Sequence, residues 1–170
     1  MTLWEVDIFP ATGQPDLVAD EIAASSADLA LGDIRTSAAA HGYLIQGTLS
    51  RDQVEQLARE LLADAIVERT VVAEVGEQQL NSPPGGNGSL VHVMLKPGVM
   101  DPVADSTLQA IQDFEFAADS VRTIRKYWIE GADEQELDNF CSRVLANDSI
   151  EQVVIGPLQL KQLDLWSDYN

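Results

Sequence analysis

The sequence has few of the residues from which most catalytic and metal-binding sites are built. It contains one cysteine, Cys141, and two histidines, His41 and His92. One cysteine excludes a disulfide framework or a thiolate metal site within a single chain, and no cysteine or carboxylate cluster joins the histidines at ligand spacing. We therefore expect no metal and no cofactor, and we expect Cys141 to be a buried structural thiol on the apolar face of a helix.

Basic residues are also scarce. Ten lysine and arginine residues stand against 28 aspartate and glutamate residues, which gives a net charge of −18. Binding to nucleic acid or to an anionic membrane requires basic surface, so the composition argues against both. The sequence shows no apolar run near the roughly 18 residues of a membrane span and no signal-peptide pattern. These absences predict a cytoplasmic protein.

Apolar residues make up 45% of the 170 residues, which is sufficient for a packed core. Apolar–polar alternation predicts strands, and apolar residues at i, i+3, i+4 and i+7 predict helices. The expected strands cover 3–9, a segment from 34, 42–49, 67–75 and 91–96, and the expected helices cover 15–31, 50–62 and a stretch from 102. Ser50 and Gln53 match a capping box, and Asp101-Pro102 matches an N-cap followed by proline in the first helical turn.

The pattern of elements occurs twice. Pro97 and Pro102 follow Pro10 and Pro15 at one common offset (97 − 10 and 102 − 15). Tyr127 follows Tyr43 at a slightly smaller offset (127 − 43), and the apolar positions of the 50–62 helix recur at nearly the same offset, beginning with Leu137 after Val54. The extra residues of the first copy place His41 in an insertion or turn, and the alternation of the strand places His92 on its more polar face.

We therefore predict an α+β fold made of two repeats, each running strand, helix, one long strand or hairpin, helix, strand. The expected divisions are a first repeat at 1–75, a flexible linker rich in Pro, Gly, Ser and Asn at 76–89, a second repeat at 90–155 and a tail at 156–170. The two repeats should pack as a pseudo-dimer within one chain, with an antiparallel sheet. The tail is expected to add an edge strand or to lead into a further segment, from the spacing of Leu158, Leu160, Leu163 and Leu165.

Three segments of the second repeat carry a resemblance to a known family. VHVMLKPGVMDP (91–102), VRTIRKYWIEG (121–131) and CSRVLANDSIEQ (141–152) resemble, in the same order, the PurS family, the small component of phosphoribosylformylglycinamidine synthase. The resemblance extends from Leu90 to about Ile155. The first repeat matches in outline, with Gln14 where the second has Asp101. Two such repeats in one polypeptide resemble the N-terminal region of the large, fused synthase.

The resemblance implies a non-catalytic part of an enzyme that converts formylglycinamide ribonucleotide, glutamine and ATP into formylglycinamidine ribonucleotide. It implies PurL-like synthase and PurQ-like glutaminase partners, between which PurS helps to pass ammonia, and it leaves a homo-oligomer open. The residues expected to dock partners or to line the ammonia path are Lys96, Asp101, Arg122, Arg125 and Lys126. The alternatives for these residues are surface solvation or salt bridges for the basic cluster and helix capping for Asp101.

Two other classes of function remain as alternatives. Paired βαββαβ units of the ACT type bind small molecules at their interfaces, although this sequence lacks a glycine-rich loop between the first strand and the first helix. A stand-alone enzyme is disfavoured because the sequence offers no nucleophile–base pair. The sequence does not decide between a separate subunit and a fragment of a longer synthase.

Overall fold

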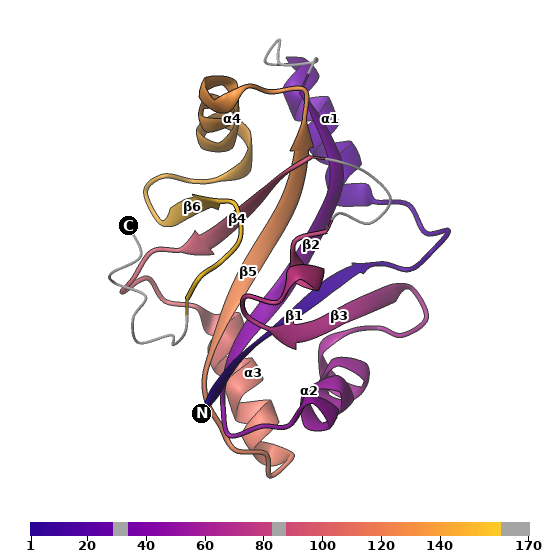
Figure 1. Cartoon of the computed structure of the whole chain (residues 1–170), viewed down its shortest axis with the longest axis vertical. Helices are drawn as coiled ribbons and strands as arrows, with labels where there is room; N and C mark the ends of the chain where they lie inside the picture. Colours follow the sequence, from indigo (N-terminus) through magenta and orange to yellow (C-terminus); the bar gives the residue numbers. More distant parts are fainter. Residues whose placement is uncertain (29–33, 83–87, 161–170) are drawn as a thin grey trace.

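A computed structural model of the chain describes residues 1–28, 34–82 and 88–160 (Figure 1). The first half contains β1 (Thr2–Pro10), α1 (Leu17–Asp28), β2 (Arg35–Gly47), α2 (Arg51–Leu57), the π-helical turn η1 (Ala58–Leu62), β3 (Glu68–Glu74) and the 3-10 turn η2 (Gln78–Leu80). The second half contains β4 (Ser89–Leu95), α3 (Pro102–Asp113), β5 (Ala118–Glu130), α4 (Glu134–Phe140), the π-helical turn η3 (Cys141–Leu145) and β6 (Glu151–Ile155). The predicted helix end near 31, the middle of the predicted linker and the last ten residues of the tail lie outside the described residues.

The six strands form one sheet in the order β3-β1-β2-β5-β4-β6, and each neighbouring pair is antiparallel. The α+β class and the antiparallel sheet are therefore confirmed. The two long strands β2 and β5 pair along the middle of the sheet. Each half contributes three strands, so the interior is continuous across the chain.

Local sequence signals set the helix starts. Ser50 and Gln53 form the predicted capping box before α2, and Asp133 and Glu136 form a second one before α4. Asp101 caps α3, whose first residue is Pro102, as the sequence predicts. These side chains satisfy backbone N–H groups that have no partner within the helix.

The order strand, helix, long strand, helix, strand occurs in both halves, with β2 and β5 each 13 residues long. Strand pairing shows which residues of the two halves occupy corresponding positions, and it does so more directly than the spacing between prolines. Val6 pairs with Tyr43 in the first half, and Val91 pairs with Tyr127 in the second. The offset between the first strands (91 − 6) is thus slightly smaller than the offset between the prolines (97 − 10).

The centre of β2 also differs from the expectation. His41 lies within a continuous strand opposite Arg125, not in a turn or an insertion. The neighbouring Gly42 lets β1 and β2 approach closely, because a Cβ atom there would lie 2.2 Å from the Val6 carbonyl oxygen. This crowding explains why the strand carries glycine at its centre.

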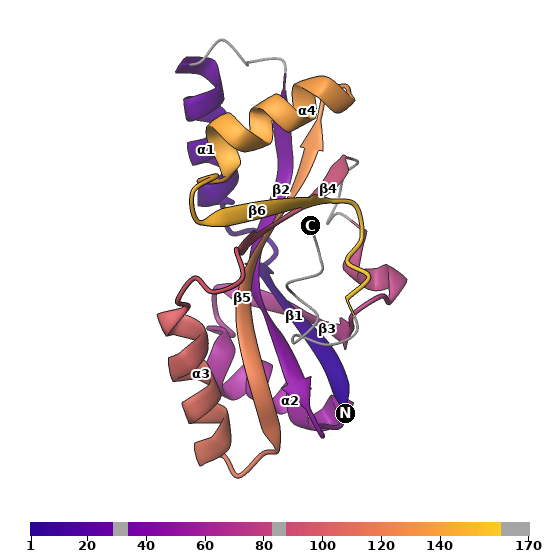
Figure 2. The same cartoon turned by 90° about the vertical axis from the view of Figure 1, so that its left-hand side faces the viewer.

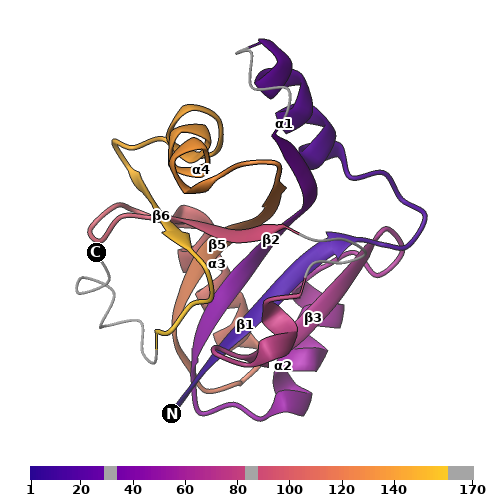
Figure 3. The same cartoon turned by 45° about the horizontal axis from the view of Figure 1, so that its top comes forward.

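Helices α1 to α4 cover one face of the sheet in two pairs, α1 with α4 and α2 with α3 (Figure 2). Figure 3 shows α1 and α4 at the same end of the sheet. The core under α2 and α3 includes Trp4, Val6, Ile45, Val54, Leu57 and Ile111. The core under α1 and α4 includes Ile22, Val91, Tyr127, Leu137, Phe140 and Cys141. Each core combines side chains from both halves of the chain.

The opposite face carries η2 and the segment after β6 (Figure 2). Leu80, Leu158 and Leu160 are buried against it. The first part of the predicted flexible linker is therefore packed. The predicted edge strand of the tail is not formed at 156–160, where the leucines cover the sheet instead. Phe9 and Trp128 stack beneath this layer with ring centroids 5.7 Å apart, so Trp128 packs the two halves together.

Candidate functional site

The middle of the helix-bearing face lies between the two helix pairs, and there the side chains of His41 and Arg125 meet across β2 and β5. His41 is exposed, and the side chain of Arg125 is 40% exposed. Each residue lines two clefts, one on either side. We call the two clefts together the central groove.

The two clefts occupy equivalent places in the two halves. The first has a volume of about 340 Å³ and is lined by residues that include Phe9, Pro10, Leu17, Val18, Val67 and Glu68. The second has a volume of about 440 Å³ and is lined by residues that include Tyr43, Met94, Met100, Val103, Thr123 and Glu151. Both are mainly apolar with a few converging polar groups, which is typical of binding sites.

Two aspartates hold the clefts in shape. Asp101 Oδ1 accepts a hydrogen bond from the N–H of Ala104 at 3.1 Å, and its Oδ2 accepts from the N–H and hydroxyl of Thr123, each at 2.9 Å. Each carboxylate oxygen thus has a different task, one capping α3 and the other tying the helix to β5. Asp101 is buried and caps α3, which is the alternative that the sequence offers for this residue.

Asp16 does the same in the first half. Its Oδ1 accepts from the N–H of Ala19 at 3.0 Å, and its Oδ2 accepts from the N–H of Ala39, on β2, at 3.1 Å. The offset between Asp16 and Asp101 (101 − 16) equals the offset between the first strands, so the two aspartates are equivalent. The sequence-based match of Gln14 to Asp101 was therefore wrong. The error came from counting between prolines and not between paired strand residues.

Arg125 is neutralised within the groove. Its guanidinium pairs with Glu151, donates a hydrogen bond to the Tyr127 hydroxyl at 3.1 Å and lies 5.9 Å from the centroid of that ring.

Burial raises the pKa of Tyr127, against the opposing effect of Arg125. Burial likewise raises the pKa of Tyr43 in the second cleft. Both phenols therefore stay protonated at neutral pH.

A separate charged cluster lies on the opposite face of the sheet, beneath η2. The ammonium of Lys126 is fully buried and donates to Glu5 Oε2 at 2.7 Å, to Asp7 Oδ2 at 2.6 Å and to the Leu80 carbonyl at 2.6 Å. Its Nζ also lies 5.3 Å from the centroid of the Trp128 ring. A buried cation is stable only with partners of this kind.

The protonation states in this cluster differ from those of exposed groups. Burial raises the pKa of Asp7 well above its usual value, and the charge of Glu5 raises it further. Hydrogen bonding from Asp7 and the charge of Lys126 outweigh burial at Glu5, whose pKa is lowered. The same buried site thus shifts the two pKa values in opposite directions, and Lys126 contacts both side chains. Burial lowers the pKa of the neighbouring His92 to about 4, which keeps its ring neutral. His92 lies on the same face of the sheet as Glu5 and Lys126, as its alternation predicts, and it is buried there.

The predicted docking residues do not form one surface. Strand alternation directs Arg125 to the helix-bearing face and Arg122 and Lys126 to the other. Lys126 is buried, so it offers no exposed surface in this chain. Arg122 is half-buried in a small pocket with Leu44, Met94 and Asp101. Lys96 is half-buried in the turn after β4.

Cys141 is buried under α4, as predicted, and burial raises the pKa of its thiol to about 12. A thiol in this state is a poor nucleophile.

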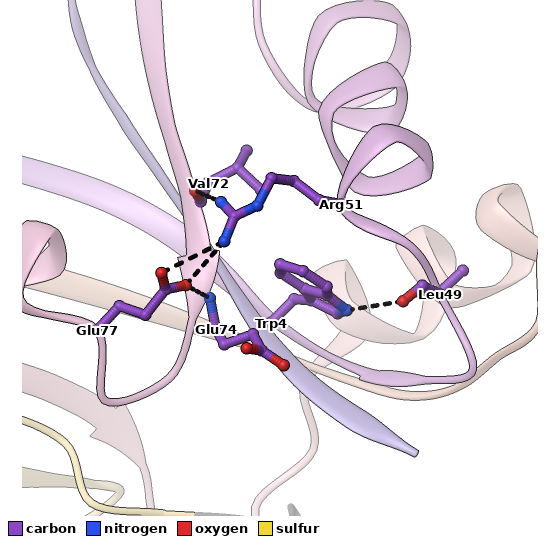
Figure 4. Close-up of polar contacts among 6 residues, drawn as sticks. All are labelled: Trp4, Leu49, Arg51, Val72, Glu74 and Glu77. Atoms are coloured by element: carbon purple, nitrogen blue, oxygen red, sulfur yellow. Dashed lines mark hydrogen bonds and ion pairs between the residues drawn. The ribbon is translucent and has the colours of Figure 1, made fainter.

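A polar network at the far end of the sheet is equally structural (Figure 4). There Arg51 pairs with Glu77 and lies over the ring of Trp4, whose indole N–H donates to the Leu49 carbonyl.

Within residues 1–28, 34–82 and 88–160, no group of three or more His, Cys, Asp or Glu side chains is placed to hold a metal ion. Over the same ranges, no helix is long and apolar enough to cross a membrane. The lining of the two clefts is mainly apolar, which is a feature of binding sites.

Sequence reasoning missed Glu5, Asp7 and Asp16. A signal for the first two exists, because Glu5 and Asp7 alternate with Trp4 and Val6 in a strand whose two faces are both covered. Charged residues in such a strand need an internal partner. The signal for Asp16 is its place immediately before a helix, where aspartate is a preferred cap.

The model of the PurS family, described as phosphoribosylformylglycinamidine (FGAM) synthase, matches residues 89–157. The match begins at the first residue of β4 and ends two residues after β6, so it includes every element of the second half. This segment is a PurS-like domain, as the sequence resemblance predicts, and the match implies a role in FGAM synthase of purine biosynthesis. No curated protein matches the chain.

Proposed function

We propose that the chain is a non-catalytic assembly component of FGAM synthase in de novo purine biosynthesis. It would join a PurL-like synthase part to a PurQ-like glutaminase part and help to pass ammonia between them in the cytoplasm. The observation that carries this proposal is the family match over residues 89–157.

The first half supports a tandem arrangement. It repeats the element order of the PurS-like domain. Asp16 and Asp101, which we call the aspartate clamps, each bind the backbone N–H groups of one helix and one central strand. We infer that residues 1–75 and 90–155 are two PurS-like repeats that form a pseudo-dimer around the β2–β5 pairing. One chain would then supply what two separate subunits supply in an unfused assembly.

The chemistry of the described residues supports a non-catalytic role. The Cys141 thiol is buried and protonated, and Lys126 is fully engaged by carboxylates. Of the residues predicted to dock partners, Lys96, Arg122 and Arg125 retain exposed surface. We propose that these three contact partners and that Asp101 and Lys126 support the surfaces from within.

The test is reconstitution with PurL-like and PurQ-like components. Glutamine-dependent formation of FGAM should require the chain, whereas formation from added ammonium should require it much less. Cys141→Ala should leave both rates unchanged. Glutamine hydrolysis or ATP hydrolysis by the homogeneous chain alone would overturn the assignment, and so would full glutamine-dependent activity in its absence.

The apolar first cleft favours one alternative, a regulatory module of the ACT type that binds a small molecule. Tyr127, Leu17 and His41 could contact such a ligand. Calorimetric titration with amino acids and purine nucleotides would distinguish the two functions. Saturable binding together with no effect on reconstituted FGAM formation would favour the alternative.

A further inference from the structure

Exposed apolar side chains gather around the central groove. Leu17 is 70% exposed, and Val18 and Val67 are also exposed at the first cleft. Met100 is 78% exposed, and Val103 is exposed at the second. Large apolar side chains in contiguous exposed patches mark sites of interaction. Burial of the groove by a partner would therefore remove several large apolar side chains from water.

The patch lies on fixed elements. Leu17 and Val18 begin α1, which Asp16 ties to β2. Val103 lies in the first turn of α3, which Asp101 ties to β5. The apolar side chains on the two sides are thus held at a set separation across His41 and Arg125. A preformed surface of this kind loses little conformational entropy when it binds.

The charge around the groove determines the kind of partner. Exposed carboxylates lie within three residues of the exposed apolar side chains: Asp20 and Glu21 near Leu17 and Val18, Asp64 near Val67, and Asp105 near Val103. We call these four carboxylates the acidic rim. Glu68 and Glu151 lie inside the clefts, and Arg125 is already paired with Glu151. A second copy of the chain would bring a further net charge of −18, and like charges placed together oppose association.

We propose that the central groove docks a segment of a partner protein in which apolar side chains are flanked by lysine or arginine. The apolar side chains fill the two clefts on either side of His41, and the basic side chains pair with the acidic rim. This inference rests on the proposed function, because the partner is taken to be a component of the synthase.

The experiment measures binding of the full chain to the full-length PurL-like and PurQ-like components by calorimetry and sedimentation. Leu17→Glu and Met100→Glu place a carboxylate in each cleft at positions that are already exposed, so the fold should be retained. Each should weaken binding to one component at least tenfold. Ile155→Glu, at an exposed apolar position that lines neither cleft, is the matched control and should bind as the unchanged chain does.

Reversing the rim charge provides an independent measurement. The variant Asp20→Lys with Glu21→Lys should weaken binding, and binding of the unchanged chain should weaken as sodium chloride rises. If the groove variants bind both components normally, the inference fails while the proposed function stands. If the unchanged chain binds neither component, the proposed function fails and the inference fails with it. Self-association that Leu17→Glu abolishes would identify a second copy as the occupant and would overturn the inference.

Discussion

At the scale of one residue, Lys126 is a buried cation that pairs with two buried acidic side chains, Glu5 and Asp7. Its ammonium lies in the interior with carboxylates from β1 and a carbonyl from η2 around it. Removing one partner of a buried ion pair leaves an unmatched charge, which costs more than the pair itself contributes. Because Glu5 and Asp7 are buried beside it, Lys126 should contribute strongly to the stability of the fold.

We predict that Lys126→Met lowers the free energy of unfolding by about 3–5 kcal/mol. Urea denaturation followed by circular dichroism measures the change. Lys96→Met, in a half-buried turn, should alter the free energy by no more than about 0.5 kcal/mol. Adding Glu5→Gln to Lys126→Met should recover part of the loss. A loss below about 1 kcal/mol for Lys126→Met would contradict the ion-pair assignment.

His92 should make stability depend on pH. Its pKa of about 4 in the folded chain lies below the value of 6.5 for the unfolded chain, so folding favours the neutral ring. This stability is fully present above pH 6.5 and is lost as pH falls towards 4. The difference between the two pKa values corresponds to about 3 kcal/mol, of which about 2 kcal/mol should be lost by pH 5.

The measurement is urea denaturation at pH 7.5 and pH 5. His92→Gln should remove this part of the pH dependence, and His41→Gln, at an exposed position, should retain it. Glu5 and Lys126 face His92, so the same series should be run in buffers of constant ionic strength. An unchanged pH dependence in His92→Gln would assign it to other groups.

The aspartate clamps act at the scale of elements. A helix cap normally satisfies only the first turn of its own helix, whereas Asp16 and Asp101 each also bind the backbone of a central strand. The clamp orients α1 against β2 and α3 against β5. It thereby determines where Leu17 and Val103 lie beside the groove.

We predict that Asp101→Ala lowers the free energy of unfolding by about 2–3 kcal/mol, through loss of the cap and of the bonds to Thr123. Asp16→Ala should cost less, about 2 kcal/mol, because Asp16 makes one hydrogen bond fewer. Asp105→Ala, at an exposed position in the first turn of α3, is the matched control. Thermal and urea denaturation would contradict the clamp if Asp101→Ala were no less stable than Asp105→Ala.

At the scale of the whole molecule, β2 and β5 join the two halves along most of their length. The core beneath α2 and α3 combines Val54 and Leu57 from the first half with Ile111 and Val121 from the second. Each half supplies only a part of this core. The sheet, the two cores and the groove are therefore built from both halves of the chain.

We predict that the described fold unfolds in one cooperative transition. With Trp166 replaced by phenylalanine, fluorescence of Trp4 and of Trp128 can be followed separately in Trp128→Phe and Trp4→Phe variants. Leu57→Ala should cost about 2–5 kcal/mol and shift both signals together. Two separate midpoints, with only the Trp4 signal moved, would show that the halves unfold independently.

The sequence by itself determined the order of the elements, most helix starts and the PurS-like segment. The starts of α2 and α3 could be predicted from Ser50, Gln53 and Asp101, because a capping side chain bonds to a backbone N–H only three residues further along the chain. The burial of Cys141 followed from helical periodicity, which is also local. The second half carries several of these signals in the right order, and its PurS-like character could therefore be predicted from the sequence.

Only the tertiary structure decided what meets across strands. Lys126 is 121 residues from Glu5 and 119 from Asp7, and no local pattern connects them. The equivalence of Asp16 with Asp101 emerged from strand pairing, since turns of different length shift the count between prolines without shifting the sheet. The groove likewise exists only because β2 and β5 bring His41 and Arg125 together. Pairing register and sheet face depend on contacts distant in the chain, and the sequence records these only indirectly.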